Sequence, residues 1–174
     1  MSDEAKINEL SAEFLEALPQ IFRPHDLFRL FSVVLEENSG SVAMGYWLTH
    51  GEGRKKSMRL YGWAGLGVPE EKGSLFVKTL VIPVFARFMR EPCNDIMLMD
   101  MSTRLGEYPR SLRHIVEPYL VGLSMMVVPL ISVFDEMDGV IVCYRRGEQP
   151  FLDSDVELAN MVAPRMSKSL SQML

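Results

Sequence analysis

The chain has 174 residues, of which 48% are hydrophobic and 24% charged, and its net charge is −5 at pH 7. This length and apolar content suit a single globular domain with a sizeable core. The acidic balance argues against direct binding to nucleic acid or to anionic membranes. No stretch approaches the about 20 apolar residues that a membrane span needs, and the N-terminus lacks the basic and apolar parts of a signal peptide. We therefore expect a cytoplasmic protein.

Two helices are predicted before the first strand. Residues 3–18 carry a narrow apolar stripe at spacings of three and four, which is typical of a coiled-coil seam. Pro19 and Pro24 interrupt this helical pattern. Asp26 is then a suitable N-cap for a second helix that runs to about Glu37.

A hairpin and a buried helix come next. Residues 42–49 and 57–64 are predicted strands, because both are apolar or aromatic and glycines lie between them. Residues 75–89 predict a helix that is apolar on most sides and therefore heavily buried. Pro83 should break or bend this helix, and Glu91–Pro92 should end it.

The second half of the chain alternates short helical turns and strands. Residues 96–100 predict a short strand, and residues 108–119 contain a helical turn or two. Residues 123–134 and 140–144 are apolar strands, joined by an acidic turn at residues 135–139. Because this turn ends in a glycine, the pattern indicates a tight β-hairpin in the middle of a sheet.

A helix with a clear start closes the chain. Asp153 is a candidate N-cap, and Asp155 with Glu157 places negative charge at the positive end of the helix dipole. Pro164 predicts a kink near the middle of this helix.

The chain contains two cysteines, Cys93 and Cys143. Cys143 lies within an apolar strand, and a structural disulfide is not expected in a reducing compartment. No spacing of cysteine and histidine matches a zinc site. We expect both thiols to be inert packing or loop residues.

The order of these elements resembles the GAF domain, a small-molecule-sensing relative of the PAS domain. The resemblance covers roughly residues 24–174, and it rests on the order and spacing of short motifs. Those motifs are Glu91–Pro92, Ile96 to Asp100, Gly122, Ser124, Pro129–Leu130, Asp138–Gly139–Val140, Phe151 and Asp155. The resemblance implies an α+β sandwich with a central antiparallel sheet of about six strands. It places the N- and C-terminal helices on one face of the sheet and a ligand pocket on the other, under the middle region.

Several members of this family differ from the chain at their binding sites. Bilin-binding relatives carry a Cys beside a His, whereas His114 is flanked by Arg113 and Ile115. Cys93 and Cys143 do not resemble the cysteine set of the methionine-sulfoxide reductase relatives, and the charged motif of the cyclic-nucleotide-binding relatives is not recognisable. The sequence also lacks a paired nucleophile and base, a glycine-rich phosphate loop and a metal-ligand cluster. We therefore expect no enzymatic activity, and the sequence identifies no cofactor.

Four polar residues of the middle region are candidates for ligand contact. Asp100 ends a strand and His114 lies near apolar residues, although a turn-forming Asp and a structural His are the ordinary roles of such residues. Arg104 and Arg113 would clamp a carboxylate or phosphate through paired donors, although each taken singly is more often solvated.

Methionines lie where the walls of the pocket are expected. Met97, Met99 and Met125 are the candidates, because the flexible thioether side chain adapts to irregular apolar ligands. Packing in the core explains these methionines equally well.

Two hypotheses follow for the function. In the first, residues 21–174 form a sensory domain that binds an unidentified small molecule and signals through its terminal helices to an output domain or partner protein. Residues 1–20 then serve dimerisation or signalling, and the protein is a homodimer in signal transduction or transcriptional control. In the second, the chain is a ligand-free dimerisation or scaffold domain whose middle helix fills its own pocket.

Overall fold

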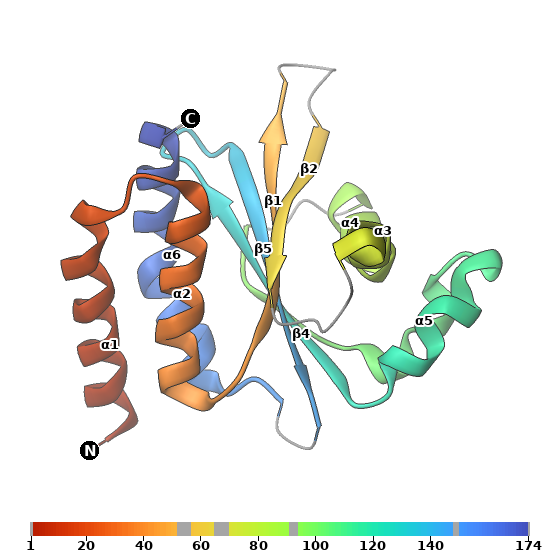
Figure 1. Ribbon diagram of the computed structural model, residues 1–174. Helices are drawn as coiled ribbons and strands as arrows, with labels where there is room; N and C mark the ends of the chain where they lie inside the picture. Colours follow the sequence, from red (N-terminus) through yellow and green to blue (C-terminus); the bar gives the residue numbers. More distant parts are fainter. Residues whose placement is uncertain (1, 52–56, 65–69, 91–93, 148–149, 174) are drawn as a thin grey trace.

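The structure is a computed structural model that describes residues 2–51, 57–64, 70–90, 94–147 and 150–173. It has three layers, with a central sheet between two groups of helices (Figure 1). One group, which we call the terminal-helix layer, consists of α1 (Asp3–Ala17), α2 (Pro24–Ser39) and α6 (Asp153–Met173), with the short helix η1 (Leu18–Gln20) between α1 and α2.

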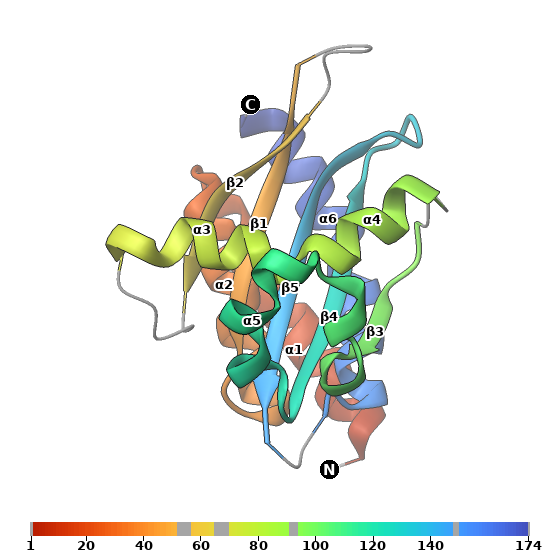
Figure 2. The ribbon, with the colours of Figure 1, turned by 90° about the vertical axis from the view of Figure 1, so that its right-hand side faces the viewer.

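The other group, which we call the distal layer, crosses the opposite face of the sheet (Figure 2). Its helices and helical turns are α3 (Glu70–Leu80), α4 (Ile82–Arg90), η3 (Met101–Thr103), η4 (Leu105–Glu107), η5 (Arg110–Leu112) and α5 (Arg113–Leu120). The predicted break in the apolar helix is confirmed, because α3 and α4 are separated at Val81, two residues before Pro83.

The sheet has five antiparallel strands in the described part of the chain, rather than the expected six or so. Their spatial order is β2 (Ser57–Ala64), β1 (Ala43–His50), β5 (Met137–Arg146), β4 (Leu123–Ile131) and β3 (Met97–Asp100). The segment between β3 and β4 forms helical turns in the distal layer, and these include the helical turns predicted within residues 108–119. The α+β class, the antiparallel sheet and the position of the terminal helices on one face are as predicted.

Alternation along the central strands divides the core into two halves. On β5, Ile141 and Cys143 face the terminal-helix layer, whereas Val140, Val142 and Tyr144 face the distal layer. All five side chains are buried, which explains why the sequence of this strand is almost continuously apolar. Both faces of the sheet therefore contribute to the hydrophobic core.

The turn between β4 and β5 differs from the prediction. It comprises Ser132 to Glu136, and Asp135 rather than Gly139 has a positive φ, of 59°. Gly139 lies inside β5, opposite Leu48 of β1, where a Cβ atom would be 2.6 Å from the carbonyl oxygen of Trp47. The glycine is therefore needed for close approach of two strands and not for the turn.

The starts of two helices also differ in detail. Pro24 occupies the first turn of α2, so Asp26 lies within the helix and is not its N-cap. At the start of α6, Asp155 rather than Asp153 satisfies a free backbone donor, since its Oδ2 accepts a hydrogen bond of 2.8 Å from the amide of Leu152. Pro164 lies within α6, which continues to Met173.

Candidate functional site

The distal layer is tightly packed against the sheet. Its helices contribute Val77, Val84 and Val116, which are fully buried, and the sheet contributes Met125 and Val127, which are also fully buried. Side chains of this chain therefore occupy much of the face on which the family resemblance places a ligand pocket.

Two tyrosines are buried within this packing. Tyr108 donates a hydrogen bond of 2.6 Å to the carbonyl oxygen of Leu80. Tyr144, on β5, is also buried, but its hydroxyl has no hydrogen-bond partner among the described residues. Burial raises the pKa of both phenols, and the neighbouring Tyr108 raises that of Tyr144 further. The Tyr144 hydroxyl therefore stays protonated and is a buried donor without an acceptor.

Arg104 has a second buried donor without a partner. Its Nη1 forms an ion pair of 3.0 Å with Glu107, whereas its Nε is buried and has no hydrogen-bond partner among the described residues. Arg104 lies between η3 and η4, the segment that leads into Tyr108. The distal layer thus contains two unsatisfied donors and no matching acceptor in the described part of the chain.

Three of the predicted site residues meet at one edge of the sheet. Met99, Asp100 and Met125 line a groove of about 190 Å³ together with Ser124 and Phe151. Met99 and Met125 pair across β3 and β4, and both are buried in the distal half of the core. Both methionines therefore belong to the distal half of the core.

Asp100 is exposed and organises the turn that follows β3. Its Oδ1 accepts hydrogen bonds from the amide of Ser102 at 3.0 Å and from the Ser102 hydroxyl at 2.6 Å. These bonds to Ser102, aided by Arg104, hold the pKa of Asp100 below its usual value. The carboxylate thus acts as the N-cap of η3 in this structure.

The other predicted residues are spread over the distal layer. Arg113 donates hydrogen bonds of 3.1 Å to the carbonyl oxygens of Tyr108 and Gly106, so it ties the loop to the start of α5. His114 is exposed on α5, and Met97 is half-buried against the distal core. The structure does not bring these three side chains to the groove at the sheet edge.

A second opening on the distal face lies between the β1–β2 hairpin and the two helices α3 and α4. It has a volume of about 440 Å³, and its lining combines apolar side chains, which include Trp47, Val81 and Phe85, with Arg59 and Lys78. Trp47 and Phe85 meet edge to face, with ring centroids 5.4 Å apart.

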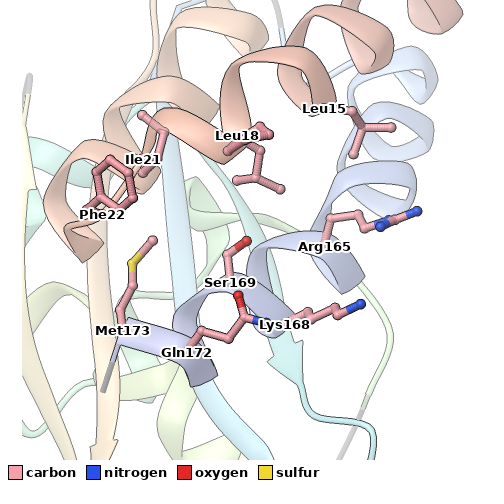
Figure 3. A pocket seen from close by; sticks show the side chains of 10 residues that line it. Leu15, Leu18, Ile21, Phe22, Arg165, Lys168, Ser169, Gln172 and Met173 are labelled. Carbon is pink, nitrogen blue, oxygen red and sulfur yellow. The ribbon is translucent and has the colours of Figure 1, made fainter.

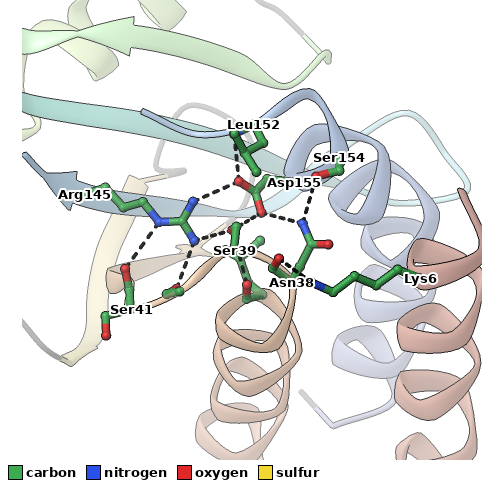
Figure 4. Close-up of polar contacts among 10 residues, drawn as sticks. Lys6, Asn38, Ser39, Ser41, Arg145, Leu152, Ser154 and Asp155 are labelled. Atoms are coloured by element: carbon green, nitrogen blue, oxygen red, sulfur yellow. Dashed lines mark hydrogen bonds and ion pairs between the residues drawn. The ribbon is translucent and has the colours of Figure 1, made fainter. Parts of the chain in front are cut away.

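A buried ion pair joins the sheet to the terminal helices (Figure 4). Arg145 Nη1 lies 2.9 Å from Asp155 Oδ2, and the other carboxylate oxygen accepts hydrogen bonds from Asn38 and Ser39 at the end of α2. Arg145 also donates to the carbonyl oxygens of Ser41 and Gly40 and lies over the ring of Phe151. This cluster connects α2, β5 and α6 at one point.

Sequence reasoning recognised Asp155 but missed Arg145. The available signal was alternation: Arg145 shares the terminal-helix face of β5 with Ile141 and Cys143. A cation at an inward position of a buried strand indicates a buried acidic partner.

Cys143 is fully buried, which raises the pKa of its thiol and agrees with the prediction of an inert cysteine. Cys93 and the Glu91–Pro92 motif lie outside the described residues.

A larger surface groove lies elsewhere, between the α1–α2 connection and the end of α6 (Figure 3). We call it the terminal groove; it lies between residues 15–22 and residues 165–173 and has a volume of about 620 Å³.

The described residues contain no candidate membrane span and no candidate metal site. No helix in these ranges has the length and apolar character to cross a membrane. No group of three or more His, Cys, Asp or Glu side chains is placed to bind a metal ion in the same ranges.

Comparisons with known proteins identify the family. The GAF domain profile matches residues 24–170, whereas a search of curated protein sequences finds no match. The GAF domain of an Acinetobacter phosphoenolpyruvate-protein phosphotransferase has a TM-score of 0.66 at 13% identity, over 99% of this chain and 96% of that one. A GAF domain/HD domain protein from Geobacter sulfurreducens has a TM-score of 0.61 at 15% identity, over 90% and 97%.

A third solved structure with the same fold belongs to a ligand-dependent transcription factor. It is an N-acylhomoserine lactone dependent LuxR family transcription factor from Burkholderia cenocepacia, with a TM-score of 0.58 at 12% identity, over 95% of this chain and 99% of that one. Identities this low show a shared fold. The profile match spans most of the chain, and the chain belongs to the GAF domain family.

Proposed function

We propose that this GAF domain is a non-catalytic sensor that binds a small molecule in its distal layer. The observation that carries the proposal is the Tyr144 hydroxyl, a buried donor without an acceptor among the described residues. An unsatisfied buried hydroxyl costs about 1–3 kcal/mol, so a ligand that supplies an acceptor gains binding free energy there. The unpartnered Nε of Arg104 is a second donor in this layer, which favours a ligand with oxygen acceptors.

The predicted site residues have distinct roles in this proposal. Met97, Met99 and Met125 form adaptable apolar walls. Asp100 and Arg104 lie on the turns that lead from β3 into the distal layer, where Arg104 offers its free donor. Arg113 holds the loop before α5, and His114 lies on the exposed side of that helix. Ligand access to Tyr144 then requires movement of this loop segment, because the Tyr144 side chain is buried in the structure.

β5 offers a route from the ligand to the terminal helices. Tyr144 and Arg145 are consecutive residues with side chains on opposite faces of the sheet. Displacement of Tyr144 would therefore shift the neighbouring Arg145 and its ion pair with Asp155, which lies in the first turn of α6. We propose that signalling passes through this contact to α6, and that the domain acts as a cytoplasmic homodimer paired through α1 and α6.

The relatives support a role in signalling. Similar structures come from a methyl-accepting chemotaxis protein, a sensor histidine kinase protein and the lactone-dependent transcription factor. We propose by analogy that this chain serves signal transduction or transcriptional control, through an output domain or partner protein.

Native mass spectrometry of protein purified from cells, compared with the same sample after denaturation, tests the proposal. We expect the native protein to carry a releasable small molecule, and the Tyr144→Phe variant to lose it. Tyr61→Phe removes the same hydroxyl from an exposed tyrosine and should retain the ligand. Absence of a bound mass, together with no thermal shift in a screen of small carboxylates and amides, would contradict the sensor.

A ligand-free scaffold is the second candidate function. The dense distal packing favours it, since α3, α4 and α5 place fully buried valines against the sheet where a pocket would be. The two functions differ in their dependence on concentration. A scaffold gains stability only with protein concentration, whereas a sensor also gains stability with its ligand.

A further inference from the structure

The terminal groove has apolar side chains in its lining and a highly exposed aromatic ring at its edge. Leu18 and Ile21 face Met173 across the groove, and Phe22 projects from its edge (Figure 3). Phe22 is 79% exposed, although burial of an aromatic ring is strongly favourable. A soluble protein that leaves such a side chain in water beside a groove has a surface suited to a partner.

The neighbouring surface extends this feature around α6. A second groove, of about 450 Å³, lies on the other side of the helix beside Val133 and Phe134, and the two grooves share Lys168 and Gln172. Val133 is 85% and Phe134 82% exposed, so the three most exposed large apolar side chains in the described ranges border these two grooves. The turn that presents Val133 and Phe134 is ordered by hydrogen bonds to the Ser132 hydroxyl.

The charged side chains that line the terminal groove are all cationic. Arg165 and Lys168 project from α6 on its wall, and no Asp or Glu is among its lining residues. Both side chains are exposed, and neither has an ion-pair partner in the described part of the chain. Since the chain as a whole has a net charge of −5, this cationic wall is a local exception.

We propose that the terminal groove binds an acidic amphipathic helix of a partner protein. Apolar side chains on one stripe of such a helix would fill the groove, while carboxylates on its flank would pair with Arg165 and Lys168. A helix suits a groove that lies between helical segments, because its side chains at spacings of three and four project along one line. The proposal is independent of the ligand in the distal layer.

A second copy of this chain suits the groove less well. The stripe of α1 that carries Ile7, Leu10 and Phe14 is buried in its own domain, so a second copy cannot insert this stripe into the groove. Two copies facing each other groove to groove would also leave a gap, since both surfaces are hollow there. The partner must therefore bring a convex apolar surface of its own.

Fluorescence anisotropy with two designed peptides tests this proposal on the full chain. The probe is a labelled helical peptide of about 18 residues with a leucine stripe and glutamates elsewhere, and its counterpart carries lysines in place of the glutamates. We expect the glutamate probe to bind more tightly than the lysine probe, with an affinity that falls as salt rises. The Arg165→Glu/Lys168→Glu double variant should weaken glutamate-probe binding by about tenfold or more and reverse the preference.

The matched control is the Arg29→Glu/Arg59→Glu double variant, which makes the same charge change at two exposed arginines outside the groove. It should bind the glutamate probe as the unmodified chain does, and Tyr144→Phe should do the same. Equal binding of both probes, or equal loss in both double variants, would overturn the proposal. A further outcome is that the unmodified chain self-associates and that Phe22→Asp abolishes this self-association. If the probe then binds only to the Phe22→Asp variant, the groove belongs to a second copy of the chain, which would also overturn the proposal.

Discussion

Arg145 Nη1 lies 2.9 Å from Asp155 Oδ2, and the exposed fractions of the two side chains are 6% and 0%. The pair connects the end of β5 to the first turn of α6, and hydrogen bonds from Asn38 and Ser39 complete the coordination of the carboxylate (Figure 4). Lys6 Nζ adds a bond of 2.8 Å to the carbonyl oxygen of Asn38, which brings α1 into the same cluster. All three terminal helices thus depend on one polar centre.

Asp155→Ala should strongly destabilise the fold, because it leaves the Arg145 guanidinium buried without its counter-charge. Loss of one partner of a buried pair costs about 3–5 kcal/mol. Urea denaturation measures this change in the free energy of unfolding. Asp153→Ala, at an exposed position of the same helical turn, should cost only about 0.3–1 kcal/mol. Similar losses in both variants would show that the effect comes from the helix dipole.

Gly139→Ala should destabilise the centre of the sheet. The new Cβ would lie 2.6 Å from the carbonyl oxygen of Trp47, so β1 and β5 must move apart. Overpacking of this kind costs about 1–3 kcal/mol. Thermal denaturation measures the effect, with Gly106→Ala as the control, since no described atom lies within 4 Å of a Cβ there. An unchanged melting temperature for Gly139→Ala would contradict the strand register.

Tyr144→Phe should stabilise the protein once any bound small molecule has been removed. The change deletes a buried hydroxyl that has no partner among the described residues, and such a group costs about 1–3 kcal/mol. Tyr108→Phe should have the opposite effect, because it deprives the Leu80 carbonyl oxygen of its donor. Chemical denaturation of protein refolded from urea compares the two. Destabilisation by both changes would mean that Tyr144 is satisfied in the apo protein.

Glu13→Gln should stabilise the fold near pH 7 and lose this advantage in acid. Repulsion from Glu37 comes first among the causes that raise the pKa of Glu13, with smaller contributions from Glu9 and Glu16. Because the folded-state pKa exceeds the unfolded value, the folded chain loses stability as pH rises through the interval between them. The gain in stability from Glu13→Gln is therefore complete above the folded-state pKa of Glu13.

The melting temperatures of Glu13→Gln and the unmodified protein should converge near pH ~3, where carboxylates are protonated in both states. Added salt should also reduce the difference at neutral pH, because Glu13 is exposed. Glu117→Gln changes an exposed carboxylate on α5, outside this group, and serves as the control. If the melting temperature of Glu13→Gln stays above that of the unmodified protein in acid, the stabilisation comes from helix propensity.

Much of the element order was predictable because it depends on neighbours in the chain. The strand at Ser57–Ala64 has the predicted bounds, and the division of α3 from α4 near Pro83 follows from a missing amide donor. The predictions from the sequence were wrong where the same residues fit two different local structures. Gly139 satisfied the requirements of a turn, but its place was decided by contact with Trp47, which is far away in the sequence.

The sequence by itself determined the fold class, the order of helices and strands and the family, because periodicity, turn residues and short motifs act within a few residues. Only the tertiary structure paired Arg145 with Asp155, left the Tyr144 hydroxyl without an acceptor and formed the terminal groove from residues 15–22 and 165–173. These features arise when helices dock on a sheet. Docking depends on the shapes and charges of whole faces, which no local pattern encodes.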